Sequence, residues 1–326
     1  MGYSKSIYMT AQNKLDSRRK AAVEELEIRR AKAYTAIPEL AEIQSRIAAC
    51  GAQVIGAFAK GANGKAYVEE LARESLSAQK RRKELLIEAG LPENYLEAQY
   101  VCNICEDTGV TDGGICDCQR KLLVETAKDE ISKHAPLRTS TFEKFSLDFY
   151  PEATDANGIS PKKRMGEIAK FCEDYANDFS PKSPSLLMHG ATGLGKTHLS
   201  LGIANVVTEK GYGLIYLSAP NLFSELERER FSRQNYNESS FEQELLETDL
   251  IIIDDLGIEF STQFTSSCLY NIVNTRMLSG KPTIISTNLT PEELEDKYTQ
   301  RITSRIIGSY ISLKFIGRDI RQLKRY

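Results

Sequence analysis

Long apolar runs are missing from this 326-residue sequence, and none approaches the roughly 18 residues of a membrane-spanning helix. Residues 1–20 also lack the apolar stretch of a secretory signal. We therefore expect a cytoplasmic protein without a membrane partner. Thiols stay reduced in that compartment, which argues against disulfides among the seven cysteines.

An excess of charge of one sign is missing as well, because 42 lysines and arginines are balanced by 45 aspartates and glutamates. The resulting net charge of −3 gives no global reason to expect nucleic-acid binding. Any contact with DNA would need a local basic patch.

The first third of the sequence is predicted to be helical. Between residues 15 and 90, apolar side chains recur mostly at three- and four-residue steps, the spacing of one face of an amphipathic helix. Pro38 interrupts the first stripe and is expected to start a new helix, because proline is tolerated in a first turn. The basic runs SRRK and QKRRK indicate solvated helix faces, with contact to a partner or DNA as the alternative. We expect a helical N-terminal domain at residues 1–99.

Four cysteines lie in one short polar stretch, YVCNICEDTGVTDGGICDCQR: Cys102, Cys105, Cys116 and Cys118. A C-x-x-C pair and a C-x-C pair separated by a glycine-containing loop can place four thiolates around one tetrahedral Zn²⁺. Four protein ligands close the coordination shell, which favours a structural metal over a catalytic one. An iron–sulfur cluster and redox-active thiols are the alternatives. We expect this metal-binding module to span residues 100–135.

The remaining sequence is predicted to form an α/β domain. Residues 136–164, expected as a linker, include FYPEATDANGISPKK, whose proline, glycine and polar content is typical of a linker or a surface loop. Within residues 165–326, the apolar stretches SLLMHG, YGLIYLS, DLIIID, PTIIST and SYISLKF alternate with helical segments. This alternation predicts a five-stranded parallel sheet with helices on both faces.

A phosphate-binding motif, G-x-x-x-x-G-K-T, follows the first of these strands and opens a helix. Its glycines let backbone N–H groups face phosphate oxygens. Lys196 brings a positive charge to the β- and γ-phosphates, and the Thr197 hydroxyl can ligate Mg²⁺. The expected nucleotide-binding residues of this loop are Gly190, Ala191, Thr192, Gly193, Leu194, Gly195, Lys196, Thr197 and His198.

Polar side chains end two further strands. DLIIIDD delivers Asp254 and Asp255 to the carboxyl edge of the sheet, where α/β proteins bind ligands. We expect Asp254 to hold Mg²⁺ and Asp255 to orient or deprotonate the attacking water, with a turn-capping role for Asp255 as the alternative. Asn288 follows the next strand, where it can bind the lytic water or the γ-phosphate; otherwise it is a turn residue before Thr290, a helix N-cap.

Two arginine segments follow. Arg301 and Arg305 are four residues apart on one face of a short helix, and one of them could reach a neighbouring subunit's γ-phosphate; surface salt bridging is the alternative. Arg318 and Arg321 begin the last helix, where one could contact phosphates of the same chain.

These motifs occur in an order that resembles the AAA+ ATPases from about Thr139 to Tyr326. More narrowly, the sequence resembles bacterial helicase loaders of the DnaC/DnaI type and the related IstB-type transposition helpers. STFEKFSLDFY is similar to a phenylalanine-containing segment of that group, and the cysteine stretch resembles the zinc module of DnaI-type loaders.

The resemblance implies an AAA+/ASCE fold that binds ATP with Mg²⁺, with Zn²⁺ in the N-terminal module, and that has no C-terminal lid. It further implies that Lys196 and Thr197 hold phosphate and Mg²⁺, that Asp254 and Asp255 form the Walker B pair, that Asn288 is sensor 1, Arg305 the arginine finger and Arg321 sensor 2. Many such ATPases carry glutamate at the Asp255 position, so we expect slow intrinsic turnover.

By the same resemblance, the leading hypothesis is an ATP-dependent loader that self-associates with ATP, binds a hexameric replicative helicase through its N-terminal domain and places it on single-stranded DNA. An IstB-like helper of a transposase and a non-hydrolysing adaptor are the alternatives. In such loaders a helical insertion contacts single-stranded DNA, and Phe231, Arg233 and Tyr236 lie in that position. An amphipathic helix packed through Leu222, Phe223 and Leu226 is the alternative for its first half.

Overall fold

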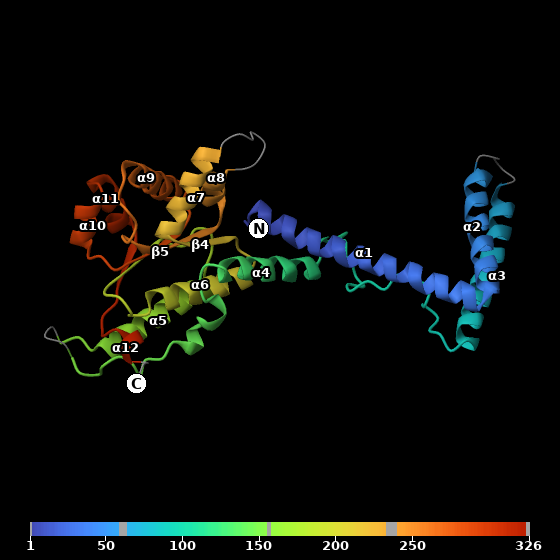
Figure 1. Cartoon of the computed structure of the whole chain (residues 1–326), viewed down its shortest axis with the longest axis horizontal. Coiled ribbons are helices and arrows are strands. Elements are labelled where there is room, and N and C mark those ends of the chain that lie inside the picture. The colour runs from blue at the N-terminus through green and yellow to red at the C-terminus, as the bar shows by residue number, and fades with distance from the viewer. Residues whose placement is uncertain (1, 59–63, 155–157, 233–239, 324–326) are drawn as a thin grey trace. The chain divides into compact units, whose positions relative to one another are not determined.

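The computed structural model describes residues 2–58, 64–154, 158–232 and 240–323. The chain forms two compact units (Figure 1), one of residues Gln12–Gln119 and one of Met1–Ala11 together with Arg120–Tyr326. No helix within the described ranges combines the length and the apolar character needed to cross a bilayer.

The first unit is mainly helical, as predicted. Its elements are α1 (Lys5–Ala36), which begins in the other unit, α2 (Pro38–Phe58), α3 (Gly64–Glu88), and a hairpin of β1 (Val110–Thr111) and β2 (Gly114–Ile115). Pro38 is the first residue of α2, as its tolerance in a first turn predicts. Buried side chains of all three helices, among them Leu40, Ile43 and Leu86, form one small core.

The second unit contains the predicted five-stranded parallel sheet. Its strands are β3 (Leu186–His189), β4 (Leu214–Ser218), β5 (Leu250–Leu256), β6 (Thr283–Thr287) and β7 (Ile311–Lys314), in the order β4-β5-β6-β3-β7. Its helices are α4 (Asp117–Ser132), which begins in the first unit, α5 (Pro161–Asn177), α6 (Lys196–Glu209), α7 (Ala219–Ser232), α8 (Phe241–Glu247), α9 (Gln263–Leu278), α10 (Pro291–Lys297), α11 (Gln300–Ser309) and α12 (Ile320–Leu323).

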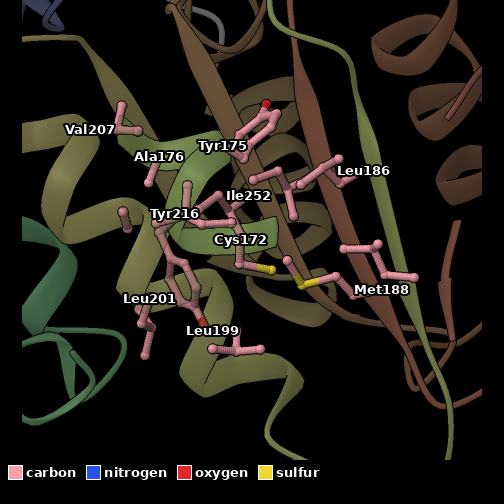
Figure 2. Close-up of a cluster of buried hydrophobic side chains, with 14 of the residues drawn as sticks. Cys172, Tyr175, Ala176, Leu186, Met188, Leu199, Leu201, Val207, Tyr216 and Ile252 are labelled. Carbon is pink, nitrogen blue, oxygen red and sulfur yellow. The ribbon is translucent and has the colours of Figure 1, made fainter. Parts of the chain in front are cut away.

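Helices cover both faces of this sheet. On one face α5 and α6 pack on alternate strand residues such as Met188 and Ile252, as Figure 2 shows. On the other face α7, α8, α9, α10 and α11 enclose the intervening residues, among them Leu187 and Ile253. Burial on both faces explains the near-continuous apolar strands. It leaves the carboxyl edge of the sheet as the place where polar side chains gather.

The stretch 136–164 is not the linker that its composition predicts. It contains two short 3₁₀ helices, η2 (Leu137–Thr139) and η3 (Phe142–Lys144). Leu137 and Tyr150 are buried in the core beside α5 and α6, and the Tyr150 hydroxyl donates to the Leu194 carbonyl at 2.9 Å. The few apolar residues of this stretch therefore attach it to the sheet unit.

The N-terminal residues also differ from the expected boundaries. Residues 1–11 belong to the unit that contains the sheet. The Gly2 N–H donates to the Asp249 carboxylate at 3.2 Å, and the Tyr3 hydroxyl donates to the Thr208 carbonyl at 3.3 Å. These two bonds attach the start of α1 to the sheet unit. Helical periodicity in the sequence does not predict them, because it does not show which residues a helix contacts.

Candidate nucleotide-binding site

The glycine-rich loop lies between β3 and α6, the context that the motif requires. Gly190 and Gly193 have φ values of 143° and 76°, which L-residues rarely adopt. A Cβ on Gly190 would lie 2.4 Å from the backbone carbonyl oxygen of Phe315, so the backbone can pass there only without a side chain. The loop then leads into α6, whose N-terminus attracts anions.

Lys196 is buried at the start of α6, and its ammonium group uses all three of its donors. They bond the carbonyl oxygens of Gly190 at 2.7 Å and Ala191 at 2.8 Å, and Asn288 Oδ1 at 2.8 Å. Burial lowers the pKa of Lys196, while the carboxylates of Asp255 and Asp254 act in the opposite direction. A phosphate oxygen that replaced one of these neutral acceptors would give the ammonium group a negatively charged partner.

Thr197 and Asp254 form a group of oxygens suited to a hard cation. The Thr197 hydroxyl donates to Asp254 Oδ2 at 3.0 Å, and Oδ1 lies 3.3 Å away. A hydroxyl and a carboxylate beside a phosphate-binding loop match the donors that hold Mg²⁺ in P-loop proteins. The two residues predicted to share Mg²⁺ are thus adjacent.

Asp255 and Asn288 meet at the same edge of the sheet. Asn288 Nδ2 lies 3.5 Å from Asp255 Oδ1, while its Oδ1 accepts from Lys196. Burial raises the pKa of Asp255, and the charge of Asp254 adds to this effect. Thr290 is the N-cap of α10, so Asn288 can contact Lys196 while the residue two positions later starts a helix.

A cavity of about 270 Å³ lies in front of these groups. Its lining includes loop residues 192–198 together with Asp255 and Asn288. Phe145 and Phe149, from the stretch expected as a linker, also line the cavity. The lining therefore combines polar and cationic groups with aromatic side chains, as in many ligand sites.

The predicted arginines are placed differently. Arg321 lines the cavity, and the neighbouring Ile320 N–H donates to the Gly193 carbonyl at 3.0 Å. Arg305 is not among the residues that line it. Arg305 Nε donates to Asn274 Oδ1 at 2.8 Å, and its guanidinium carbon lies 4.9 Å from the centroid of the Tyr270 ring. Arg301 is exposed, and its carbonyl accepts a bond from Arg305 at 2.7 Å.

The four clustered cysteines converge in the helical unit, where their sulfur atoms all lie within 4.8 Å of one another. Cys102 and Cys116 are 3.8 Å apart, and Cys105 and Cys118 are 3.3 Å apart. Four sulfurs about 2.3 Å from a tetrahedral zinc would be separated by about 3.8 Å. The buried Asp107 carboxylate accepts from the N–H groups of Val101 and Cys102, which fixes the first turn. The cluster could bind a metal.

The expected DNA-contacting segment is only partly described. Phe231 is 80% exposed on α7, while Arg233 and Tyr236 lie outside the described residues. Three earlier residues of α7 are buried against the sheet, as the amphipathic alternative predicts: Leu222, Phe223 and Leu226.

Two site residues were missed by the sequence reasoning. Tyr216 on β4 and Ser286 on β6 both donate to the Asp254 carboxylate. Ser286 lies two residues before Asn288, and Tyr216 lies two residues before the end of its strand. Their positions as polar residues near the ends of apolar strands could have indicated that they belong to the site.

Comparisons with known proteins identify the following similarities. The profile of the bacterial DnaA ATPase domain matches residues 165–311. The chain is similar to the replicative helicase loader DnaC of Escherichia coli K12, with 24% identity over 143 residues, 44% of this chain and 58% of that protein. It is also similar to DnaC of Buchnera aphidicola from Schizaphis graminum, with 24% identity over 160 residues, 49% of this chain and 65% of that protein. The chain thus spans about three fifths of the length of these relatives.

Among solved structures, the crystal structure of the DnaC helicase loader is 18% identical. Its match covers 56% of this chain and 99% of that one, with a TM-score of 0.46.

Proposed function

We propose that this chain is an AAA+ ATPase of the DnaC type, which helps to place a hexameric replicative helicase on single-stranded DNA. The meeting of Lys196, Thr197 and Asp254 at the carboxyl edge of the sheet supports the ATPase part. The client is proposed because the curated relatives are named replicative helicase loaders.

The residues of the site divide the chemistry among them. Lys196 exchanges its carbonyl partners for oxygens of the β- and γ-phosphates, and Thr197 and Asp254 hold Mg²⁺. Mg²⁺ held by these two residues would supply positive charge that stabilises the phosphates during transfer. Asp255 and Asn288 orient the attacking water at the phosphate end of the cavity. Because aspartate is one methylene shorter than glutamate, we expect slow turnover in the isolated chain.

Phe145 and Phe149, the aromatic side chains of the cavity lining, are proposed to contact the nucleobase. Arg321, at the start of α12, contacts the phosphates from within the same chain.

Turnover is proposed to depend on a second subunit. Arg305 lies away from its own cavity, held by Asn274 and by the Tyr270 ring. A guanidinium fixed in this way can enter a neighbouring subunit's cavity, where an arginine finger increases turnover by about 10³–10⁵. ATP binding would then favour self-association, and hydrolysis would release the helicase.

The helical unit is proposed to bind the helicase. Its four cysteines bind one structural Zn²⁺, which contributes folding free energy on the order of 10 kcal/mol in small domains. Phe231 is proposed to stack on a base of single-stranded DNA.

A loading assay tests the proposal. The helicase of the host is mixed with a forked DNA whose single strand is covered by single-strand-binding protein, and unwinding is measured. We expect this protein with ATP to start unwinding, and Lys196→Ala to abolish the effect and to lower kcat/KM for ATP by about 10²–10³. ATP turnover by Lys196→Ala equal to that of the wild type would contradict the site assignment. Nucleotide-stimulated unwinding without any turnover would identify a non-hydrolysing adaptor.

A further inference from the structure

Asp254 is a charged group held away from water. It is 5% exposed, and its carboxylate is surrounded by three hydroxyl groups. Thr197 donates from α6, Tyr216 donates from β4 to Oδ2 at 2.6 Å, and Ser286 donates from β6 to Oδ1. A buried carboxylate needs such partners, and hydrogen bonds to a charged acceptor are the stronger kind.

The packing of the sheet determines where the Tyr216 hydroxyl lies. Tyr216 pairs with Ile252, and Ser218 pairs with Asp254, so Tyr216 and Asp254 lie two residues apart on one face of adjacent strands. The Tyr216 ring is buried in the core beneath α5 and α6, near Leu199 and Leu201 (Figure 2). Because this packing fixes the ring, its hydroxyl has a fixed direction toward Asp254.

Ser286 joins both acidic residues of the site. Pairing between β5 and β6 shifts between Ile253 and Leu256, so that two β5 residues, Asp254 and Asp255, oppose the single residue Ser286. This is a β-bulge, a feature that redirects side chains next to active sites. The Asp255 N–H donates to Ser286 Oγ at 2.9 Å, and Asp255 has a φ of 55°, unusual for a residue other than glycine. One hydroxyl therefore bonds the carboxylate of Asp254 and the backbone of Asp255.

We propose that Tyr216 and Ser286 are positioning residues of the magnesium site, which hold the Asp254 carboxylate toward Thr197; Ser286 also holds Asp255 in its left-handed conformation. The inference rests on the proposed ATPase function. The terminal torsion of an aspartate is broad and roughly two-fold, so packing alone does not fix the direction of its oxygens. Two bonds from different strands, one to each oxygen, fix it before the metal arrives.

Metal binding without turnover is the direct test for Tyr216. Binding of Mn²⁺, as a spectroscopic substitute for Mg²⁺, to the full chain with a non-hydrolysable ATP analogue is measured by electron paramagnetic resonance. Loss of an outer hydrogen bond to a metal ligand typically costs 10–100-fold in metal affinity. We expect Tyr216→Phe to raise the Kd for Mn²⁺ roughly 10-fold. The metal-free variant should also melt at a lower temperature, because the buried carboxylate has lost a hydrogen bond. An equal Kd in Tyr216→Phe and wild type would overturn the inference.

A matched control removes another tyrosine hydroxyl from the same core. Tyr175 donates to the Pro184 carbonyl at 2.9 Å and does not contact Asp254. Tyr175→Phe is expected to bind Mn²⁺ as the wild type does. An equal loss of affinity in both variants would mean that general loosening of the core, and not the bond to Asp254, sets the affinity.

Ser286→Ala tests the second proposed role of Ser286, which is to hold the backbone of Asp255. At saturating Mg²⁺, Tyr216→Phe is expected to recover wild-type turnover, whereas Ser286→Ala stays slow because Asp255 has also lost its backbone partner. Full recovery by Ser286→Ala would overturn the Asp255 part. If the wild-type protein bound no Mn²⁺ together with the nucleotide, the proposed ATPase function itself would fail. If the wild type bound Mn²⁺ and the variants bound it with the same affinity, only this inference would fail.

Discussion

Replacement of Arg276 is expected to destabilise the sheet unit more than any surface change. Arg276 lies near the end of α9, is fully buried, and uses all five of its donors. They bond the carbonyls of Leu245 and Thr248 at 2.8 and 2.9 Å, Pro282 O at 2.6 Å, Asp249 O at 3.4 Å and Thr283 Oγ1 at 3.0 Å. Burial lowers the pKa of Arg276 to about 10. One side chain thus joins the end of α8 to the starts of β5 and β6.

Arg276→Met keeps an unbranched apolar stem and removes every donor. Three of the five hydrogen bonds, those to the carbonyls of Leu245, Thr248 and Pro282, are buried. A buried carbonyl that loses its donor costs about 1–3 kcal/mol. The gain from no longer burying a guanidinium offsets part of this cost. We therefore expect a loss of roughly 2–5 kcal/mol, or roughly 5–15 °C in melting temperature for a unit of this size.

The assay is thermal unfolding followed by circular dichroism with and without ATP and Mg²⁺. The transition that shifts with nucleotide belongs to the sheet unit, because a ligand stabilises the unit that binds it. Arg164→Met is the control: Arg164 is 40% exposed and pairs with Glu167 at 3.6 Å, so its loss should cost under about 0.5 kcal/mol. Equal, small shifts in both variants would refute the reasoning from donor satisfaction.

Four further results are expected. Lys196→Ala and Arg305→Ala subunits, each inactive alone, should regain turnover when mixed, because the first supplies the arginine and the second the intact cavity; a silent mixture would exclude action between subunits. Cys105→Ser should lose the stoichiometric zinc that elemental analysis finds in the wild type, and a metal-free wild type would contradict the zinc assignment. Burial lowers the pKa of His189, so the folded state should lose stability as pH falls below about 6.5, and His189→Gln should flatten the dependence of melting temperature on pH between pH 5.5 and 7.5. Phe231→Ala should weaken single-strand binding by about 1–3 kcal/mol, whereas unchanged affinity in a fluorescence titration would remove Phe231 from the DNA site.

The glycine-rich loop could be placed from the sequence because all of its residues are contiguous. A strand, a G-x-x-x-x-G-K-T run and a helix in succession fix the local geometry. Asn288 could be placed at the ligand-binding edge because parallel strands end at the same edge of the sheet. In the structure its Oδ1 accepts a 2.8 Å bond from Lys196.

Tyr216 and Ser286 could not be assigned in the same way. Their bonds to Asp254 depend on the pairing of three strands and on a one-residue bulge in β5, and a single sequence specifies neither register nor bulge directly. The prediction of a linker at residues 136–164 was wrong for a different reason. Its proline, glycine and polar residues are typical of a loop, but Leu137 and Tyr150 suffice to bury part of it.

Native mass spectrometry of this protein mixed with the replicative helicase of its host, with and without ATP, tests the central claim most directly. The account predicts a defined complex of several zinc-carrying chains per helicase ring. Absence of any complex, with the protein forming ATP-dependent assemblies on DNA alone, would contradict the loader function and favour a helper ATPase for a transposase.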